Sequence, residues 1–231
     1  MKAYKHIFFD LDRTLWDFEK NSYQVLQEIY KKYKLQEKGI PDFDYFHQKY
    51  HQINHDLWDE YRVGKITKEF LSTERFFATI RYFGIQDKEM ATQMGIDYVE
   101  LSPLQTILFP GTHELLQNLS KRYKLHLITN GFAEVQTVKL RVSDLGQYFD
   151  EVIISEQTPW KKPRPEIFKY SLNQADAKAE ESIMIGDDIR ADIKGAASVG
   201  MDQIWTNFTA AKAEYKPTYI VENLLDILDI L

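Results

Sequence analysis

The stretch Ile7-Phe8-Phe9-Asp10-Leu11-Asp12-Arg13-Thr14-Leu15 joins a short apolar run to two carboxylates that lie two residues apart. We interpret residues 4–9 as a buried strand that ends at Asp10. Two ionised carboxylates this close together are unfavourable unless a cation or hydrogen-bond donors lie near them. Because Asp is also common in turns, a simple turn at the strand end is the alternative that this stretch alone leaves open.

The residues that follow this stretch change to a helical pattern. From about residue 17, aromatic and aliphatic residues recur at spacings of three and four, which predicts amphipathic helices. We expect four helices, at about residues 17–33, 46–64, 67–83 and 87–101. No strand pattern occurs between Trp16 and Pro103, so this block should be entirely helical.

After Pro110-Gly111 short apolar strands alternate with helices. The expected strands are residues 125–129, 152–155, 182–187 and 203–206, followed by an edge strand at 219–221 and a closing helix. This alternation is typical of a parallel sheet covered by helices on both faces. We therefore predict an α/β protein with a Rossmann-like core, residues 1–16 and 104–231, and a helical cap, residues 17–103, inserted after the first strand.

The composition excludes several classes of protein. The net charge of -6 argues against binding to polymeric nucleic acid, which depends on Lys and Arg. No stretch approaches the ~20 apolar residues that a membrane span needs, and charged residues at 10–13 interrupt the first apolar run before it reaches the length of a signal peptide. The chain has no Cys, which excludes disulfides and fits a reducing compartment. We expect a cytoplasmic protein, and its oligomeric state stays open.

Polar residues follow each of the expected core strands, and ligands bind beyond these carboxyl ends in open parallel sheets. The residues are Asp10 and Asp12, Thr129 and Asn130, Ser155 with Lys162 in the next loop, and Asp187 and Asp188. Each alone could be a helix cap, a turn or a solvated side chain. Together with Asp192 the acids would crowd negative charge, and Mg²⁺ with a phosphorylated substrate is the simplest compensation. Lys162 and the amides near Asn130 could then receive the remaining phosphate charge.

Four motifs of this chain resemble, in order, those of the haloacid dehalogenase superfamily. They are Phe9-Asp10-Leu11-Asp12-Arg13-Thr14-Leu15, Ile128-Thr129-Asn130-Gly131, Lys162-Pro163, and Ile185-Gly186-Asp187-Asp188 with Asp192. The resemblance implies that Asp10 is a nucleophile that attacks phosphorus, and that Asp12 is the general acid and then the base. It also implies that Thr129 and Asn130 hold the phosphoryl oxygens and that Lys162 neutralises the transferring group.

The same resemblance implies a magnesium site. Its ligands would be Asp10, the carbonyl of Asp12, and Asp187, with Asp188 or Asp192 in support. An acid at position 12 favours a phosphatase over a dehalogenase, because an alkoxide leaving group needs a proton and a halide does not.

The helical block matches the cap that this superfamily inserts after its first motif. Residues 57–67, with Asn130-Gly131-Phe132 and the acidic turn at Ser155-Glu156, make the chain similar to bacterial nucleoside 5'-monophosphate phosphatases that act on noncanonical pyrimidine nucleotides. The resemblance thus implies a Mg²⁺-dependent phosphomonoester hydrolase for a pyrimidine nucleoside monophosphate. The alternatives are a phosphatase for phosphoglycolate or a sugar phosphate, a sugar phosphomutase, a haloacid dehalogenase, and a non-catalytic binding module. Arg13 and Trp160 depart from the usual pattern and could reshape the pocket.

Two further groups in the helical block need an interpretation. His47, His51 and His55 recur every four residues, as zinc ligands on a helix can, but we interpret them as a solvated face. Its aromatic residues fit a hydrophobic core better than a platform on which a base would stack. They are Tyr23, Tyr30, Tyr45, Phe46 and Trp58.

Overall fold

The computed structural model describes residues 4–212 and 215–231, and the chain divides into two compact units. One unit contains the chain up to Phe18 together with Thr106–Leu231, and the other is Glu19–Gln105. Phe18 lies in the first unit, where the Arg13 guanidinium is 4.3 Å from the centroid of its ring. The expected boundaries, after residues 16 and 103, lie close to these divisions.

The first unit is built on a six-stranded parallel sheet with the order β3-β2-β1-β4-β5-β6. Its strands are β1 (His6–Phe9), β2 (Lys124–Thr129), β3 (Glu151–Ile154), β4 (Ser182–Gly186), β5 (Asp202–Thr206) and β6 (Tyr219–Val221). The predicted α/β fold with a parallel Rossmann-like sheet is confirmed.

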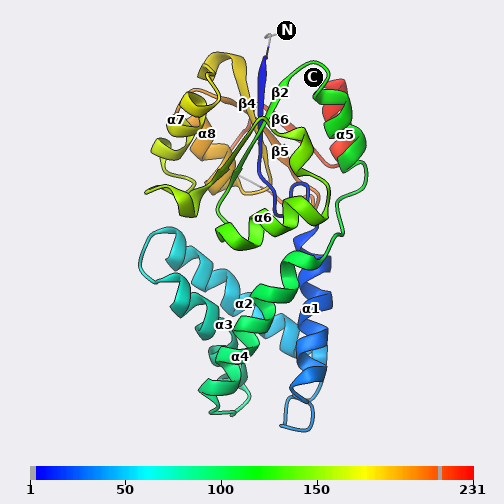
Figure 1. The fold of residues 1–231 in the computed structure, drawn as a ribbon, viewed down its shortest axis with the longest axis vertical. Coiled ribbons are helices and arrows are strands. Elements are labelled where there is room, and N and C mark those ends of the chain that lie inside the picture. Colours follow the sequence, from blue (N-terminus) through cyan, green and yellow to red (C-terminus); the bar gives the residue numbers. More distant parts are fainter. Residues whose placement is uncertain (1–3, 213–214) are drawn as a thin grey trace. The chain divides into compact units, whose positions relative to one another are not determined.

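Alternate residues of the strands supply two separate hydrophobic cores. Ile7 and Phe9 of β1 point into one core, which α5 (Thr112–Leu119), α6 (Ala133–Val142) and the closing 3₁₀ helix η6 (Leu224–Asp229) also fill. Phe8 points into the other core, with α7 (Pro165–Gln174) and α8 (Gly195–Ala197). Figure 1 shows α7 and α8 on one side of the sheet and α5 on the other. Burial of both faces explains why the central strands are mostly apolar.

Two segments of this unit, where helices were expected after the fourth core strand and at the end of the chain, are not regular α-helices. The segment after β4 begins as a π-helical turn, η5 (Ile189–Lys194), because the backbone N–H of Ile193 reaches back five residues to the carbonyl of Asp188. The chain closes with a 3₁₀ helix rather than an α-helix, and Asn223 and Asp226 form a capping box at its start. Short 3₁₀ turns also lie at η1 (Ser102–Leu104), η2 (Gly146–Tyr148), η3 (Ser155–Gln157) and η4 (Ala179–Glu181).

The second unit is helical, and the four predicted helices are present. They are α1, which starts in the first unit (Phe18–Lys32), α2 (Phe43–Arg62), α3 (Lys68–Tyr82) and α4 (Lys88–Leu101). Asp42, Thr67 and Asp87 cap α2, α3 and α4 with side-chain oxygens that accept backbone N–H bonds. None of the helices in the described ranges is long and apolar enough to cross a membrane.

The aromatic residues of this helical unit divide between core and surface. Tyr30 and Phe46 are buried in its hydrophobic core. Tyr23 and Tyr45 are exposed, and Trp58 is half-buried. The interpretation as core therefore fits two of the five aromatic side chains that the sequence singled out.

Candidate active site

The site residues lie where the central strands of the sheet end. In the parallel register Phe9 of β1 pairs with Leu127 of β2 and with Ile185 of β4. The backbone N–H of Asp10 donates to the carbonyl of Ile185 at 2.9 Å. The residues that follow β1, β2 and β4 therefore meet at one edge of the sheet, as the sequence predicted.

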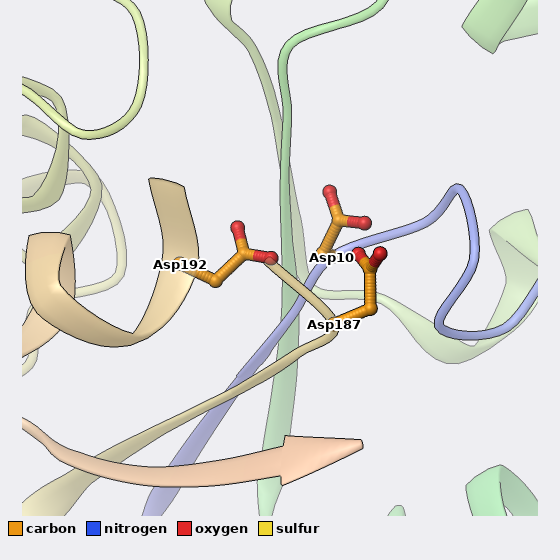
Figure 2. A group of neighbouring side chains, drawn as sticks. All are labelled: Asp10, Asp187 and Asp192. Carbon is orange, nitrogen blue, oxygen red and sulfur yellow. The ribbon is translucent and has the colours of Figure 1, made fainter. Parts of the chain in front are cut away.

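Three carboxylates converge at this edge (Figure 2). One oxygen from each of Asp10, Asp187 and Asp192 lies within 4.8 Å of the other two. Asp10 and Asp192 are buried, and Asp187 is half-buried. Burial and the neighbouring carboxylates raise the pKa of Asp187 well above its usual value. A raised pKa disfavours the ionised form of the carboxylate. The three acids can therefore be ionised together only if a positive charge lies near them.

Lys162 supplies part of that charge. Its buried Nζ lies 2.5 Å from Asp10 Oδ1 and 2.6 Å from Asp192 Oδ1, and it donates to the Ile128 carbonyl at 2.7 Å. Burial works to lower the pKa of Lys162, but the two carboxylates outweigh it and raise the pKa. Burial raises the pKa of Asp10 to about 7 although Lys162 opposes this rise. One lysine therefore does not balance three acids.

A hard divalent cation could balance the negative charge that Lys162 leaves uncompensated. Within the described residues, no hydrogen-bond donor or ion-pair partner contacts the Asp187 carboxylate, although it lies beside two other acids. Its oxygens are therefore open to a ligand. Carboxylate oxygens are the donors that Mg²⁺ prefers, and Mg²⁺ is bound by one or two carboxylates together with substrate phosphate.

The described residues contain no second group of three acids or histidines that could hold a metal. The ring of His47 packs against Tyr23 and Phe43, and His51 lies 3.1 Å from Glu19. His55 is exposed. The rings of His47 and His51 are neighbours, with centroids 6.2 Å apart, but each also has other partners.

The two acids named as alternatives in the fourth motif lie in different environments. The Asp188 carboxylate caps the π-helical turn η5, because its Oδ1 accepts hydrogen bonds from the backbone N–H groups of Arg190 and Ala191. The Asp192 carboxylate belongs to the acid cluster and accepts a bond from the backbone N–H of Asp188 at 3.1 Å. The wide turn of η5 brings these two residues together, and π-helical segments often occur at functional sites.

Thr129 and Asn130 end β2 beside Lys162. The Asn130 side chain is bonded reciprocally to the Lys162 backbone, because its Nδ2 donates to the carbonyl and its Oδ1 accepts from the N–H, both at 2.9 Å. Asn130 therefore holds the backbone at Lys162 in place, in the loop that follows η3, which we call the lysine loop. The Thr129 hydroxyl accepts a hydrogen bond from the Gln136 side chain at 2.6 Å. Ser155 is buried in η3, and its hydroxyl makes no hydrogen bond within the described residues.

Two residues that sequence reasoning did not select contact Asp12. Gln136 Nε2 donates to Asp12 Oδ2 at 2.7 Å, and Lys139 Nζ forms an ion pair with Asp12 Oδ1. Burial lowers the pKa of Lys139, and Asp12 partly offsets this effect. The sequence gives little indication of this contact, because Gln136 and Lys139 are two polar residues one turn apart on a helix that also contacts the core.

Arg13 and Trp160, the two departures from the superfamily pattern, lie in different surroundings. Arg13 adopts a left-handed conformation with φ of 65°, and its guanidinium lowers the pKa of Asp187, against the larger effect of burial. Trp160 is half-buried against the core that contains α7, and its ring centroid lies 6.1 Å from that of Tyr170. Arg13 therefore acts electrostatically on the acid cluster, whereas Trp160 packs behind the lysine loop.

The sequence profile of the haloacid dehalogenase-like hydrolases matches residues 7–206. The chain belongs to this family. This haloacid dehalogenase-like hydrolase is 35% identical over 233 residues to the pyrimidine 5'-nucleotidase PynA of Streptococcus pneumoniae, a match that covers 99% of the chain and 95% of PynA. It is 31% identical over 229 residues to the pyrimidine 5'-nucleotidase YjjG of Escherichia coli, covering 97% of the chain and 96% of YjjG.

A solved structure of the same family agrees over the whole chain. The crystal structure of the HAD-hydrolase YfnB from Bacillus subtilis, bound to magnesium, matches with a TM-score of 0.90 and 29% identity, covering 99% of each chain. The superfamily resemblance of the four motifs is thus confirmed at the level of family and fold.

Proposed function

We propose that this protein is a Mg²⁺-dependent phosphomonoester hydrolase that works through an aspartyl-phosphate on Asp10. The observation that carries the proposal is the acid cluster of Asp10, Asp187 and Asp192 around the buried Lys162, at the carboxyl edge of the sheet. Membership of the haloacid dehalogenase-like hydrolases supports it.

In the proposed reaction two aspartates of the first motif have different roles. A carboxylate oxygen of Asp10 attacks phosphorus, so that an O–P bond forms as the bond to the leaving oxygen breaks. Asp12, in its protonated form, gives its proton to that leaving oxygen. Asp12 then takes a proton from water as the water oxygen attacks phosphorus, which releases phosphate and restores Asp10. Halide would need no such proton, so Asp12 favours a phosphatase over a dehalogenase.

The residues proposed to hold Mg²⁺ are Asp10, the backbone carbonyl of Asp12, and Asp187. Asp192 would support them, because it lies in the acid cluster whereas the Asp188 carboxylate caps a helical turn. The bound ion would supply charge that removes the repulsion between the Asp10 carboxylate and an anionic phosphate.

Thr129, Asn130 and Lys162 are proposed to hold the phosphoryl group. The Thr129 hydroxyl accepts from Gln136 and can still donate its own hydrogen to a phosphoryl oxygen. Since the Asn130 amide is bonded to the lysine loop, we assign the contact with phosphate to its backbone N–H. The Lys162 ammonium would neutralise the transferring group from its position beside Asp10.

The proposed substrate is a nucleoside 5'-monophosphate with a pyrimidine base. Two relatives named as pyrimidine 5'-nucleotidases, each matched over more than nine-tenths of its length, support this assignment. The net charge of -6 is consistent with a small substrate rather than a nucleic acid polymer.

The experiment is an assay of phosphate release with Mg²⁺, comparing the wild type with Asp10→Asn. We expect the variant to lose at least about 10³-fold in kcat, because an amide cannot replace the attacking carboxylate. The exposed Asp229→Asn is the control and should keep wild-type activity. Activity of Asp10→Asn near that of the control would rule out Asp10 as the nucleophile.

The same assay over several substrates tests the proposed substrate class. UMP, dUMP and dTMP should give a higher kcat/KM than phosphoglycolate or sugar phosphates, and the reverse order would overturn the substrate but not the mechanism. A hexose 1-phosphate added to the enzyme should release phosphate. Formation of the 6-phosphate instead would identify a phosphomutase.

A further inference from the structure

Helix α6 holds both carboxylate oxygens of Asp12. Gln136 Nε2 donates to Oδ2 at 2.7 Å, and Lys139 Nζ pairs with Oδ1. The two side chains come from adjacent turns of one helix, whereas Asp12 lies more than 120 residues earlier in the chain. The carboxylate is therefore held at two points, which restricts rotation of the Asp12 side chain.

Both α6 side chains are buried, which is unfavourable for polar groups without partners. Gln136 has no exposed surface and Lys139 is 3% exposed. The Lys139 ammonium lies 3.8 Å from the centroid of the Trp16 ring, and Asp12 is its ion-pair partner. An ammonium ion buried in this way is stable only if it is paired. These two residues therefore depend on Asp12 as much as Asp12 depends on them.

The turn after β2 is shaped to accept the Gln136 side chain. The second N–H of its amide donates to the Thr129 hydroxyl at 2.6 Å, so the amide links Asp12 to a proposed phosphate ligand. A Cβ atom on Gly131 would lie only 2.8 Å from Gln136 Cγ. Glycine at this position therefore leaves the room that Gln136 occupies.

We infer that Gln136 and Lys139 are positioning residues that orient the Asp12 carboxylate for proton transfer to the leaving oxygen. The inference rests on the proposed function, because it assumes that Asp12 is the general acid. Gln136 and Lys139 act through Asp12 and contact no reacting atom.

The test compares two substrates that differ in their need for a proton. Lys139→Met removes one contact with Asp12 and is the cleaner variant, whereas Gln136→Met removes one contact with Asp12 together with the hydrogen bond to Thr129. Both substitutions keep approximately the length of the side chain. On an alkyl phosphate, we expect kcat to fall on the order of 10²-fold, because a small misplacement of a catalytic group has an effect of this size. On 4-nitrophenyl phosphate, whose leaving group needs little protonation, the loss should be less than about threefold.

The ratio of the two rates is the readout, since it does not depend on the fraction of enzyme that is folded. Arg141→Met is the matched control, because Arg141 is an exposed cation on the same helix, and its ratio should equal that of the wild type. If one of the two variants fails to fold, the other carries the test. Equal losses on both substrates would overturn the inference, because a merely structural role lowers both rates together.

Asp12→Asn separates this inference from the proposed function. By itself, Asp12→Asn should lower kcat on the alkyl phosphate more than on 4-nitrophenyl phosphate, as Lys139→Met does. In the double variant, Lys139→Met should cause no further change in the ratio of the two rates. If Asp12→Asn shows the preference and Lys139→Met does not, the inference fails and the proposed function stands. If Asp12→Asn shows no preference, Asp12 is not the acid and both fail.

Discussion

Gly186, the last residue of β4, leaves room for the Asp192 side chain. A Cβ atom at this position would lie 2.6 Å from Asp192 Cβ, and Asp192 is held by Lys162 and by the backbone N–H of Asp188. Because Asp192 can move away only by disturbing these contacts, we expect Gly186→Ala to lower the free energy of unfolding by about 1–3 kcal/mol. Chemical denaturation measures this change.

Gly146→Ala provides the control for this clash. A Cβ atom there meets its nearest neighbour, the Leu140 carbonyl oxygen, at 3.9 Å, so stability should change little. Gly186→Ala should also weaken activation by Mg²⁺, since it displaces a member of the acid cluster. A variant as stable as wild type, with unchanged activation, would mean that Asp192 can move without consequence.

At the scale of single residues, the sequence predicted the positions that follow strands. Asp10 and Asp187 were predictable because a parallel sheet brings the ends of its strands together. Gln136 and Lys139 were not, since their partner Asp12 is distant in the chain and only the folded structure brings α6 to it. The pairing of Asn130 with the Lys162 backbone was hidden for the same reason.

Among the elements, β1 and β2 are joined by a buried pair of histidines. His6 and His126 are 5% and 1% exposed, and His6 Nδ1 lies 3.1 Å from His126 Nε2. Burial lowers the pKa of His6 and lowers that of His126 to about 4. The folded protein thus resists protonation at pH values where the unfolded chain accepts protons. The contribution of these two histidines to stability should therefore be lost as the pH falls below about 6.5, whereas the raised pKa values of Asp10 and Asp187 act in the opposite direction.

His126→Leu should make the protein less sensitive to acid. Between pH 7.5 and 5, protonation of His126 in the unfolded chain alone lowers the free energy of unfolding of the wild type by about 2 kcal/mol. Over the same pH range, the free energy of unfolding of the variant, measured by denaturant titration with EDTA, should fall by about 2 kcal/mol less. His55→Gln, at an exposed histidine, should follow the wild type. A decline of His126→Leu that is as steep as that of the wild type would contradict the prediction.

The type of most elements was predictable, but the geometry of two helical segments was not. Apolar spacing distinguishes strands from helices, which is why the six strands and the four helices of the second unit were found. It does not distinguish an α-helix from the π-helical turn η5 or from the 3₁₀ helix η6. Those forms depend on hydrogen bonds around Asp188 and on the capping box at Asn223.

At the scale of the whole molecule, each unit has hydrophobic cores of its own. The buried core of the helical unit runs from Val25 to Tyr98 and contains no strand residue. All residues of the acid cluster, and Lys162, belong to the α/β unit. The sequence marks this division by the start of an all-helical block near residue 17 and by its end near residue 104, after which short apolar strands alternate with helices. Binding of Mg²⁺ should therefore act on the stability of the α/β unit.

The stabilisation by Mg²⁺ should increase with pH. Without the ion, the raised pKa values of Asp10, about 7, and of Asp187 mean that the folded protein binds protons that the unfolded chain has released. Stability then falls as the pH rises from about 4 to 7. Since Mg²⁺ binds the ionised carboxylates, protons must leave before it binds, and its effect should be small at pH 5.5 and larger at pH 7.5.

Thermal unfolding with Mg²⁺ and with EDTA at these two pH values measures this effect. At 100 times the dissociation constant, a ligand stabilises the folded state by about 2.7 kcal/mol. Asp187→Asn should reduce the increase caused by Mg²⁺ at pH 7.5, because it removes a carboxylate that has no partner within the described residues. An effect of Mg²⁺ that is equal at both pH values, or unchanged in Asp187→Asn, would show that the ion binds elsewhere.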